Sequence, residues 1–344
     1  MQFNRLIQQA IVQGASDLII TAGSPPVIRR SGELVKLEGP NWSPGDTEIL
    51  LHQLLSDEQR RRFEQAGEIN ISYSIFGTGR FRVSGFRQRG TVGVVTRVIP
   101  SVMRSGAELG IPDAVMSFAN EQGGLIIIGG PPGSGRTTTV ATVVDKISQS
   151  RAAHIVTLEN PVEYTLRHKL GVVHQREIGL DTDSFATGLR AAMHQSPDVI
   201  VVGHMDDEIA SDVLDAASGR VLVVAVVTAR GVRDAVAGMV QRFPASAQVE
   251  AARQLAAVLR GACCQQLVRR ADKSGLLAAF EVLTMGSEIR RAIAEQQWST
   301  LAKIVESGNN PGTLSMHSAL LHLLATGEID HSEFTDAEAL LGAS

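Results

Sequence analysis

The chain has 344 residues, 44% hydrophobic and 20% charged, which is typical of a folded globular protein and excludes a disordered one. This length predicts about two domains. A formal charge of −4 and an aromatic content of 4% argue against nucleic-acid binding, so we expect no nucleic-acid partner. No apolar run approaches the roughly 18–20 residues that span a bilayer. We therefore expect no transmembrane segment.

The first hundred residues predict a small α+β domain. Apolar residues at helical spacing indicate an opening helix and a second helix near residues 49–55. Ser56 and Gln59 have the spacing of a capping box, which predicts that a third helix begins there. Strict alternation over 69–75 and 80–87, with a turn at Gly77-Thr78-Gly79 between them, predicts two strands of a meander.

Residues 101–112 are predicted to form a linker, and the character of the sequence changes after it. Short runs that are wholly apolar are typical of buried parallel strands, and helical segments lie between them. The strands are expected at 125–128, 154–158, 199–203 and 221–227, and the helices at 137–148, 184–194 and 208–217. From Gln248 onward we expect a mostly helical part, in which Cys263 and Cys264 are buried on a helix.

The most specific local motif is the segment from Gly130 to Thr137, which reads G-P-P-G-S-G-R-T between a predicted strand and a predicted helix. In the pattern G-x-x-x-x-G-K-[ST], glycines let backbone N–H groups surround phosphates, and the following helix N-terminus attracts the same anion. The hydroxyl of Thr137 would then bind Mg²⁺. The candidate phosphate-binding residues are Gly130, Pro132, Gly133, Ser134, Gly135, Arg136, Thr137 and Thr138.

One position of this motif is altered, because Arg136 occupies the place of the lysine. A guanidinium keeps the positive charge, but it is longer and planar, so it holds phosphate from a different distance than an ammonium group. We expect nucleotide binding to survive this change better than the positioning of a transition state.

The sequence resembles the secretion ATPase superfamily, and more closely the type IV pilus retraction ATPases (PilT-like). The resemblance covers nearly the whole chain. The matching segments are Gly14-Ala15-Ser16-Asp17-Leu18, Pro25-Pro26-Val27-Ile28-Arg29, Arg80-Phe81-Arg82-Val83, Arg97-Val98-Ile99-Pro100, the phosphate loop, Leu158 to Tyr164, Gln175 to Gly179, Ser184 to Ala186, Leu189 to Ala192 and Pro197 to Gly203.

This resemblance implies a PAS-like N-terminal domain (residues 1–100), the linker (101–112) and a RecA-like P-loop ATPase domain with C-terminal helices (113–344). It also implies ATP and Mg²⁺ as cofactors, and a hexameric ring of this chain or of paralogous motor subunits. The ring would bind a platform protein at the inner face of the cytoplasmic membrane, which places the chain in the cytoplasm. Arg82 and Arg97 match arginines that reach toward bound nucleotide, although both also suit a solvated strand face.

All four catalytic motifs of the family are altered here. Besides Arg136, the acidic pattern E-D-P-[IV]-E reads Glu159-Asn160-Pro161-Val162-Glu163, so an amide replaces the central carboxylate. In the Walker B pattern V-G-E-M-R-D, His204 replaces the glutamate and Asp206 the arginine. Thr228 occupies the place of a histidine in the pattern A-T-L-H-T. Phosphoryl transfer needs a positioned cation and a group that orients water, and Glu163 and Glu159 are the remaining candidates.

Three hypotheses follow. In the first, the chain is a motor-family protein that binds ATP, hydrolyses it poorly, and acts as an accessory or regulatory subunit. In the second, it is an active ATPase that powers pilus retraction with a rearranged site, in which Glu163 orients the water. In the third, it is a structural ring component that binds no nucleotide. Independently of these hypotheses, Glu163 also suits a surface or salt-bridged carboxylate.

Overall fold

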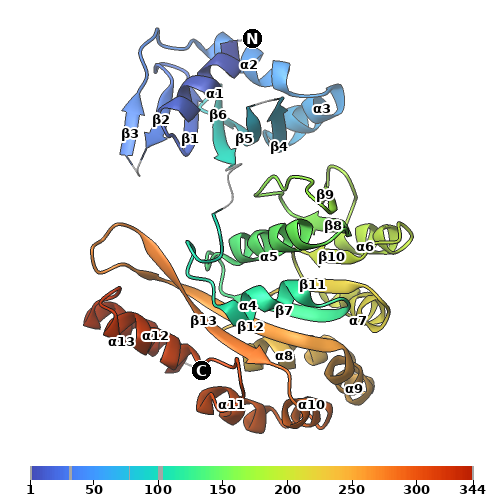
Figure 1. Cartoon of the computed structure of the whole chain (residues 1–344). Coiled ribbons are helices and arrows are strands. Elements are labelled where there is room, and N and C mark those ends of the chain that lie inside the picture. Colours follow the sequence, from blue (N-terminus) through green and yellow to red (C-terminus); the bar gives the residue numbers. More distant parts are fainter. Residues whose placement is uncertain (1, 31–32, 77, 100–103, 343–344) are drawn as a thin grey trace. The chain divides into compact units, whose positions relative to one another are not determined.

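The computed structural model describes residues 2–30, 33–76, 78–99 and 104–342, and the chain divides into two compact units (Figure 1). The first unit comprises residues 1–102 and 163–165, and the second comprises 103–162 and 166–344. Two predicted features, the turn residue Gly77 and the linker start at 101–103, lie outside the described residues. Of the predicted linker, residues 106–110 form turns, and residues 104, 105, 111 and 112 belong to no helix or strand.

The first unit contains a six-stranded antiparallel sheet in the order β3-β2-β1-β6-β5-β4, and helices pack against it. This arrangement confirms the predicted α+β unit. A single cluster of buried apolar residues, which includes Leu51, Phe63 and Phe81, forms its core. In chain order its elements are α1 Gln2–Val12, β1 Asp17–Thr21, β2 Val27–Arg30, β3 Glu33–Lys36, α2 Pro44–Leu54, α3 Asp57–Ala66, β4 Glu68–Ile75, β5 Gly79–Gln88 and β6 Thr91–Ile99.

Local sequence signals explain several of these elements. Ser56 accepts a hydrogen bond from the Gln59 backbone N–H while the Gln59 side chain accepts one from Ser56 N–H, which confirms the predicted capping box of α3. That helix ends at Gly67, whose left-handed conformation is the usual role of a C-terminal glycine. In β5, Phe81 and Val83 are buried while Arg82 between them is exposed, as the alternation predicted.

The second unit contains a seven-stranded sheet in the order β13-β12-β7-β11-β10-β8-β9, in which every strand is parallel to its neighbours except β13. All four predicted parallel strands are confirmed. The strands are β7 Gly124–Gly130, β8 His154–Glu159, β9 Val172–Glu177, β10 Val199–Val202, β11 Leu222–Thr228, β12 Leu259–Arg269 and β13 Leu276–Thr284.

Both faces of this sheet are buried, which explains why its strands are apolar without alternation. Leu125 and Ile127 of β7 belong to one buried cluster, and Ile126 and Ile128 belong to another on the opposite face. The helical segments of this unit are α4 Asp113–Met116, η1 Ser117–Asn120, α5 Arg136–Ser150, α6 Phe185–Met193, η2 Asp207–Ile209, α7 Ala210–Ser218, α8 Val232–Gln241, α9 Gln248–Val258, α10 Ser287–Ala294, α11 Trp298–Ser307, α12 Met316–Ala325 and α13 His331–Gly342.

The C-terminal part is mostly helical, as predicted, but the helix expected for the two cysteines is wrong. Cys263 and Cys264 lie in β12, where they pair with Ile128 and Gly129 of β7. Successive strand residues face opposite sides, so the two thiols belong to different core clusters. Because both faces of β12 are covered, its residues do not alternate between apolar and polar, and the sequence shows no strand pattern there.

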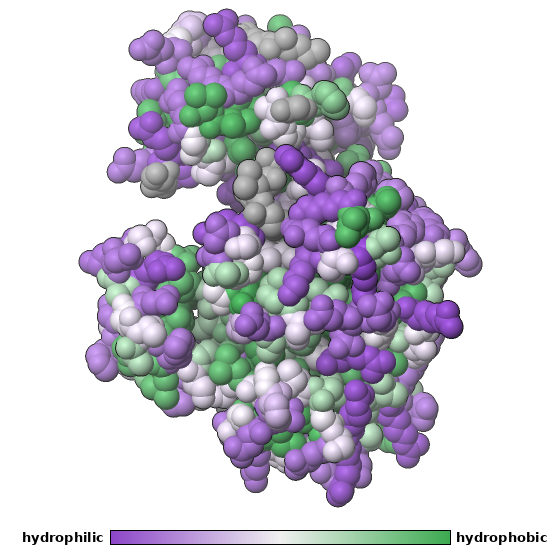
Figure 2. Space-filling view, viewed as in Figure 1, coloured by the Kyte–Doolittle hydropathy of each residue, from purple (hydrophilic) through white to green (hydrophobic). Residues whose placement is uncertain are grey.

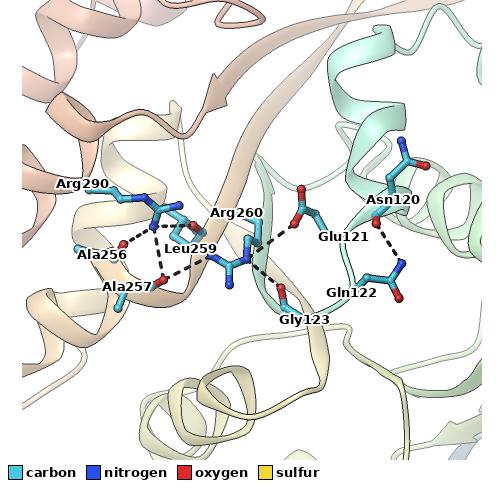
Figure 3. A network of polar contacts seen from close by, with 9 residues as sticks. All are labelled: Asn120, Glu121, Gln122, Gly123, Ala256, Ala257, Leu259, Arg260 and Arg290. Atoms are coloured by element: carbon cyan, nitrogen blue, oxygen red, sulfur yellow. Dashed lines mark hydrogen bonds and ion pairs between the residues drawn. The ribbon is translucent and has the colours of Figure 1, made fainter.

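Two arginines fix the point at which β12 begins (Figure 3). Arg290 of α10 donates hydrogen bonds from Nη1 to the carbonyls of Ala256 and Ala257, over 2.7 and 3.4 Å, and so caps the last turn of α9. Arg260 donates from Nε to the Gly123 carbonyl over 2.9 Å, just before β7. The pairing of β12 with β7 shifts register at this point. These contacts set β12 beside the strand that leads into the phosphate loop.

On the face seen in Figure 2, hydrophilic side chains are interspersed with small groups of hydrophobic ones. The exposed large apolar side chains include Phe76 and Leu170. Among the helices in the described part of the chain, none combines the length and apolar character that crossing a membrane requires.

Candidate functional site

The phosphate loop has the predicted strand–loop–helix form. β7 ends at Gly130, residues 131–135 form the loop, and α5 begins at Arg136. Gly133 and Gly135 have φ values of 79° and 87°, in the left-handed region that favours glycine. Gly135 is the N-cap, and no side chain caps this helix. Because the N-cap residue is a glycine, it offers no side-chain oxygen to the N-terminus of α5, which suits this end of the helix to an anion.

Gln265 of β12 packs against this loop. This residue was not identified from the sequence. Its Nε2 donates a hydrogen bond to the Ser134 carbonyl over 2.7 Å, and both residues are buried. A Cβ on Gly130 would lie 2.4 Å from Ser134 Oγ and 2.5 Å from the Gln265 carbonyl oxygen. The loop thus fits against β12 only with glycine at this position. Nothing in the local sequence marks Gln265, because β12 was expected to be helical.

Arg136 contacts the end of β11. Its Nη1 donates to the Val227 carbonyl over 2.6 Å and to Thr228 Oγ1 over 3.0 Å. Thr228 pairs in register with Gly130, so this contact joins the start of α5 to the neighbouring strand. The structure therefore brings together Arg136 and Thr228, two residues expected from the sequence to depart from the family pattern.

The acidic segment follows β8. Glu159 Oε1 accepts hydrogen bonds from Thr157 Oγ1 over 2.5 Å and from Gln175 Nε2 over 3.0 Å, so the surrounding strands hold this carboxylate in place. Asn160 and Glu163 are exposed. Of the two candidate catalytic carboxylates, Glu163 is the more accessible.

A second pair of altered positions meets after β10. His204 Nε2 lies 3.1 Å from Asp206 Oδ1, and both side chains are about half exposed. The preceding Gly203 N–H donates to the Leu158 carbonyl over 2.8 Å, which places this segment beside the end of β8. His204 and Asp206, the two residues expected from the sequence to depart from the Walker B pattern, thus contact each other.

Residues 130–137, Glu159, His204 and Thr228 lie at one edge of the second unit's sheet, because β7, β8, β10 and β11 are parallel and their carboxyl ends lie together. This edge is where open α/β sheets bind ligands. Glu163 belongs to the first unit. Arg82 and Arg97 also belong to the first unit, where they are directly opposite each other on β5 and β6. Arg97 Nε forms an ion pair with the buried Asp17 over 3.1 Å.

A cavity of about 400 Å³ lies beside the loop. Gly135, Thr138 and Gln265 line it on the loop side, and Arg104, Glu108 and Phe280 are among the other lining residues. This volume is within the range of small-molecule sites, roughly 300–1,000 Å³. A magnesium ion would depend on Thr137 and on phosphate oxygens, because no group of three or more His, Cys, Asp or Glu among the described residues is arranged to hold a metal.

Comparisons with known proteins agree on one family. A family profile described as "Type II/IV secretion system protein" matches residues 1–310. The chain is similar to the type IV pilus ATPase PilU of Pseudomonas aeruginosa, with 32% identity, covering 97% of this chain and 87% of PilU. It is also similar to the type IV pilus retraction ATPase PilT of the same organism, with 32% identity and 96% of each chain covered.

Among solved structures, the fold is similar to a crystal structure of the pilus retraction motor PilT with bound ADP. The TM-score is 0.90 at 35% identity, covering 97% of this chain and 96% of that one. Nearly the whole chain therefore has a structural counterpart in that solved structure.

Proposed function

Because the chain belongs to the type II/IV secretion system protein family, among relatives of the type IV pilus motor ATPases, we propose that it is a pilus motor subunit that binds ATP but is impaired in hydrolysis. In this proposal it acts as an accessory or regulatory subunit, in a hexameric ring with copies of itself or with paralogous motors. The observation that carries the proposal is that the loop cation, Arg136, is hydrogen-bonded to the end of β11.

Nucleotide binding is supported by the loop geometry. The uncapped N-terminus of α5 and the left-handed glycines fit a phosphate chain, and the neighbouring cavity has room for a nucleoside. The related PilT structure contains ADP. We propose ATP as the ligand, with phosphates on residues 130–138 and with Thr137 as the protein ligand of Mg²⁺. Bound Mg²⁺ would neutralise phosphate charge.

Impaired hydrolysis is supported by the chemistry of the side chains in the acidic and Walker B segments, because few of them can orient the attacking water. The amide of Asn160 cannot accept a proton from water, and His204 places an imidazole, paired with Asp206, where the family pattern has a carboxylate. Glu159 is already engaged by Thr157 and Gln175. Glu163 is exposed and is the remaining carboxylate that could orient water. We therefore expect turnover that is slow compared with an active motor.

We further propose that the protein lies in the cytoplasm, at the inner face of the cytoplasmic membrane, where the ring would contact a platform protein of the pilus machine. We also propose that the N-terminal domain ends at residue 100 and that the ATPase domain begins after residue 112. Arg82 is proposed to reach nucleotide, as the resemblance implies, while Arg97 has a structural partner in Asp17.

The test is a comparison of Mg-ATP binding and turnover between the wild type and the triple variant Arg136→Lys, Asn160→Asp, His204→Glu. We expect Mg-ATP to raise the melting temperature of the wild type, because a ligand at 100 times its Kd stabilises by about 2.7 kcal/mol. We expect the triple variant to hydrolyse ATP faster than the wild type. The exposed substitution Arg253→Lys on α9 is the control.

Wild-type turnover equal to that of an active pilus motor assayed in parallel would contradict impaired hydrolysis. In that case Glu163→Gln decides whether the second hypothesis, an active ATPase with a rearranged site, is correct: loss of the rate would support it. Absence of any Mg-ATP shift would favour a structural ring component.

A further inference from the structure

The starting observation is that one nitrogen of Arg136 serves two acceptors at the end of β11. Nη1 of a guanidinium carries two hydrogens, and here it contacts the Val227 carbonyl at 2.6 Å and Thr228 Oγ1 at 3.0 Å. The Val227 carbonyl belongs to the main chain and is present whichever residue occupies position 228. The other acceptor is supplied by the Thr228 side chain.

The two contacts connect the first residue of α5 to the last two residues of β11. A cation in the first turn of α5 is at the end of the helix where the dipole already repels positive charge. Hydrogen-bond acceptors such as the oxygens of β11 stabilise Arg136 there, and an anion in the loop would be a stronger, charge-assisted partner. The Thr228 side chain is exposed at the carboxyl end of β11, where its hydroxyl and an anion in the loop would compete for Arg136.

We propose that Thr228 is a positioning residue that competes with phosphate for Arg136 and so lowers the affinity of the site for nucleotide. The inference rests on the proposed function, because it concerns the same loop. It adds that two replaced motif positions act as one unit: the hydroxyl of Thr228 holds the arginine that stands in place of the lysine. A ligand must displace this hydrogen bond before Arg136 can bind its phosphates, which lowers the apparent affinity.

The affinity test compares Thr228→Val, which removes the hydroxyl at nearly constant shape, with Thr228→Ser, which keeps it. Because one hydrogen bond has a modest net value, we expect Thr228→Val to bind Mg-ATP about 3- to 10-fold more tightly than the wild type. Thr228→Ser should bind like the wild type. With Arg136→Lys in the background, Thr228→Val should change the affinity little. Inorganic pyrophosphate should show the same order, because the competition concerns phosphate.

A role of Thr228 in folding alone predicts a different result, since loss of a supporting contact would leave the affinity unchanged or weaken it in Thr228→Val. Either outcome would overturn the inference. Absence of Mg-ATP binding in every variant would overturn the proposed function and the competition together. Equal affinities in saturable binding would overturn the competition alone.

The contact itself is tested without ligand by a double-mutant cycle on melting temperatures. For a unit of this size, loss of one hydrogen bond should lower the melting temperature of Thr228→Val by about 2–4 °C. The same substitution should have less effect when residue 136 is already lysine. Strictly additive effects of the two substitutions would contradict the contact and with it the inference.

Discussion

Gln265 donates a hydrogen bond from Nε2 to the main-chain carbonyl of Ser134 over 2.7 Å, which joins β12 to the phosphate loop across 131 residues of sequence. The Oε1 of the same side chain is buried and has no hydrogen-bond partner among the described residues. A buried acceptor without a partner is costly, so the hydrogen bond to the loop has to be strong enough to hold the amide in this orientation.

The first prediction concerns this amide. Gln265→Met keeps the length of the side chain but leaves the Ser134 carbonyl without its donor, which should lower the free energy of unfolding by about 1–3 kcal/mol. The matched control is Gln266→Met on the same strand, because the Nε2 of Gln266 is buried without a partner in the described part of the chain. The control should change stability by less than about 0.5 kcal/mol. Urea unfolding measures both, and equal losses would contradict the assigned role.

The second prediction concerns the close approach of β7 and β12. A Cβ added to Gly129 would lie 2.4 Å from the buried Cys264 Sγ, and Gly129 needs no unusual backbone conformation. Gly129→Ala should therefore cost about 1–3 kcal/mol through overpacking. Cys264→Ala opens space at the same point, so the double variant should be more stable than Gly129→Ala. A double variant that is less stable than either single one would show that the two side chains do not compete for the same volume.

The third prediction separates the two arginines of the first unit. Arg97→Gln removes a hydrogen bond to Asp17, whose carboxylate is buried, and because the Arg97 side chain is 70% exposed we expect a loss of only about 1 kcal/mol. Arg82 is exposed and forms no ion pair with any described residue, so Arg82→Gln should not affect stability. If Arg82 reaches nucleotide, this variant should weaken Mg-ATP binding without lowering the melting temperature. If instead Arg97→Gln weakens Mg-ATP binding and Arg82→Gln does not, the nucleotide role belongs to Arg97.

The parts of the fold that were predicted from sequence are those with local signals. Short apolar runs predicted the four parallel strands, and the glycine spacing predicted the phosphate loop with its helix. The missed elements depend on pairing with distant residues. β12 and β13 form a hairpin whose inner strand is covered on both faces, so Cys263 and Cys264 show no alternation.

The candidate site was predicted as a set of positions but not as a set of contacts. The sequence showed that Arg136, His204, Asp206 and Thr228 depart from a pattern. It could not show that they contact each other in two pairs, because side-chain partners depend on the register of β7, β10 and β11. Gln265 was missed for the same reason, since its role depends on a strand that the sequence did not reveal.

The last prediction concerns pH and Glu281, which lies opposite Cys264 on β13. Its carboxylate accepts a hydrogen bond from the backbone N–H of Val232, the first residue of α8. Burial raises the pKa of Glu281 above its ordinary value of 4.5, and the nearby Asp234 and Glu306 act in the same direction, against the hydrogen bond from Val232.

A raised pKa in the folded state means that protonation favours folding. The stabilisation from Glu281 is therefore complete below pH 4.5 and is lost as the pH rises through the folded-state pKa. Glu281→Gln remains neutral at every pH and can still accept from Val232. Relative to the wild type, the variant should thus gain stability as the pH rises from 4 to 8. Urea unfolding of both proteins across this range measures the difference, and parallel pH profiles would show that Glu281 is not enclosed in solution as it is in the structure.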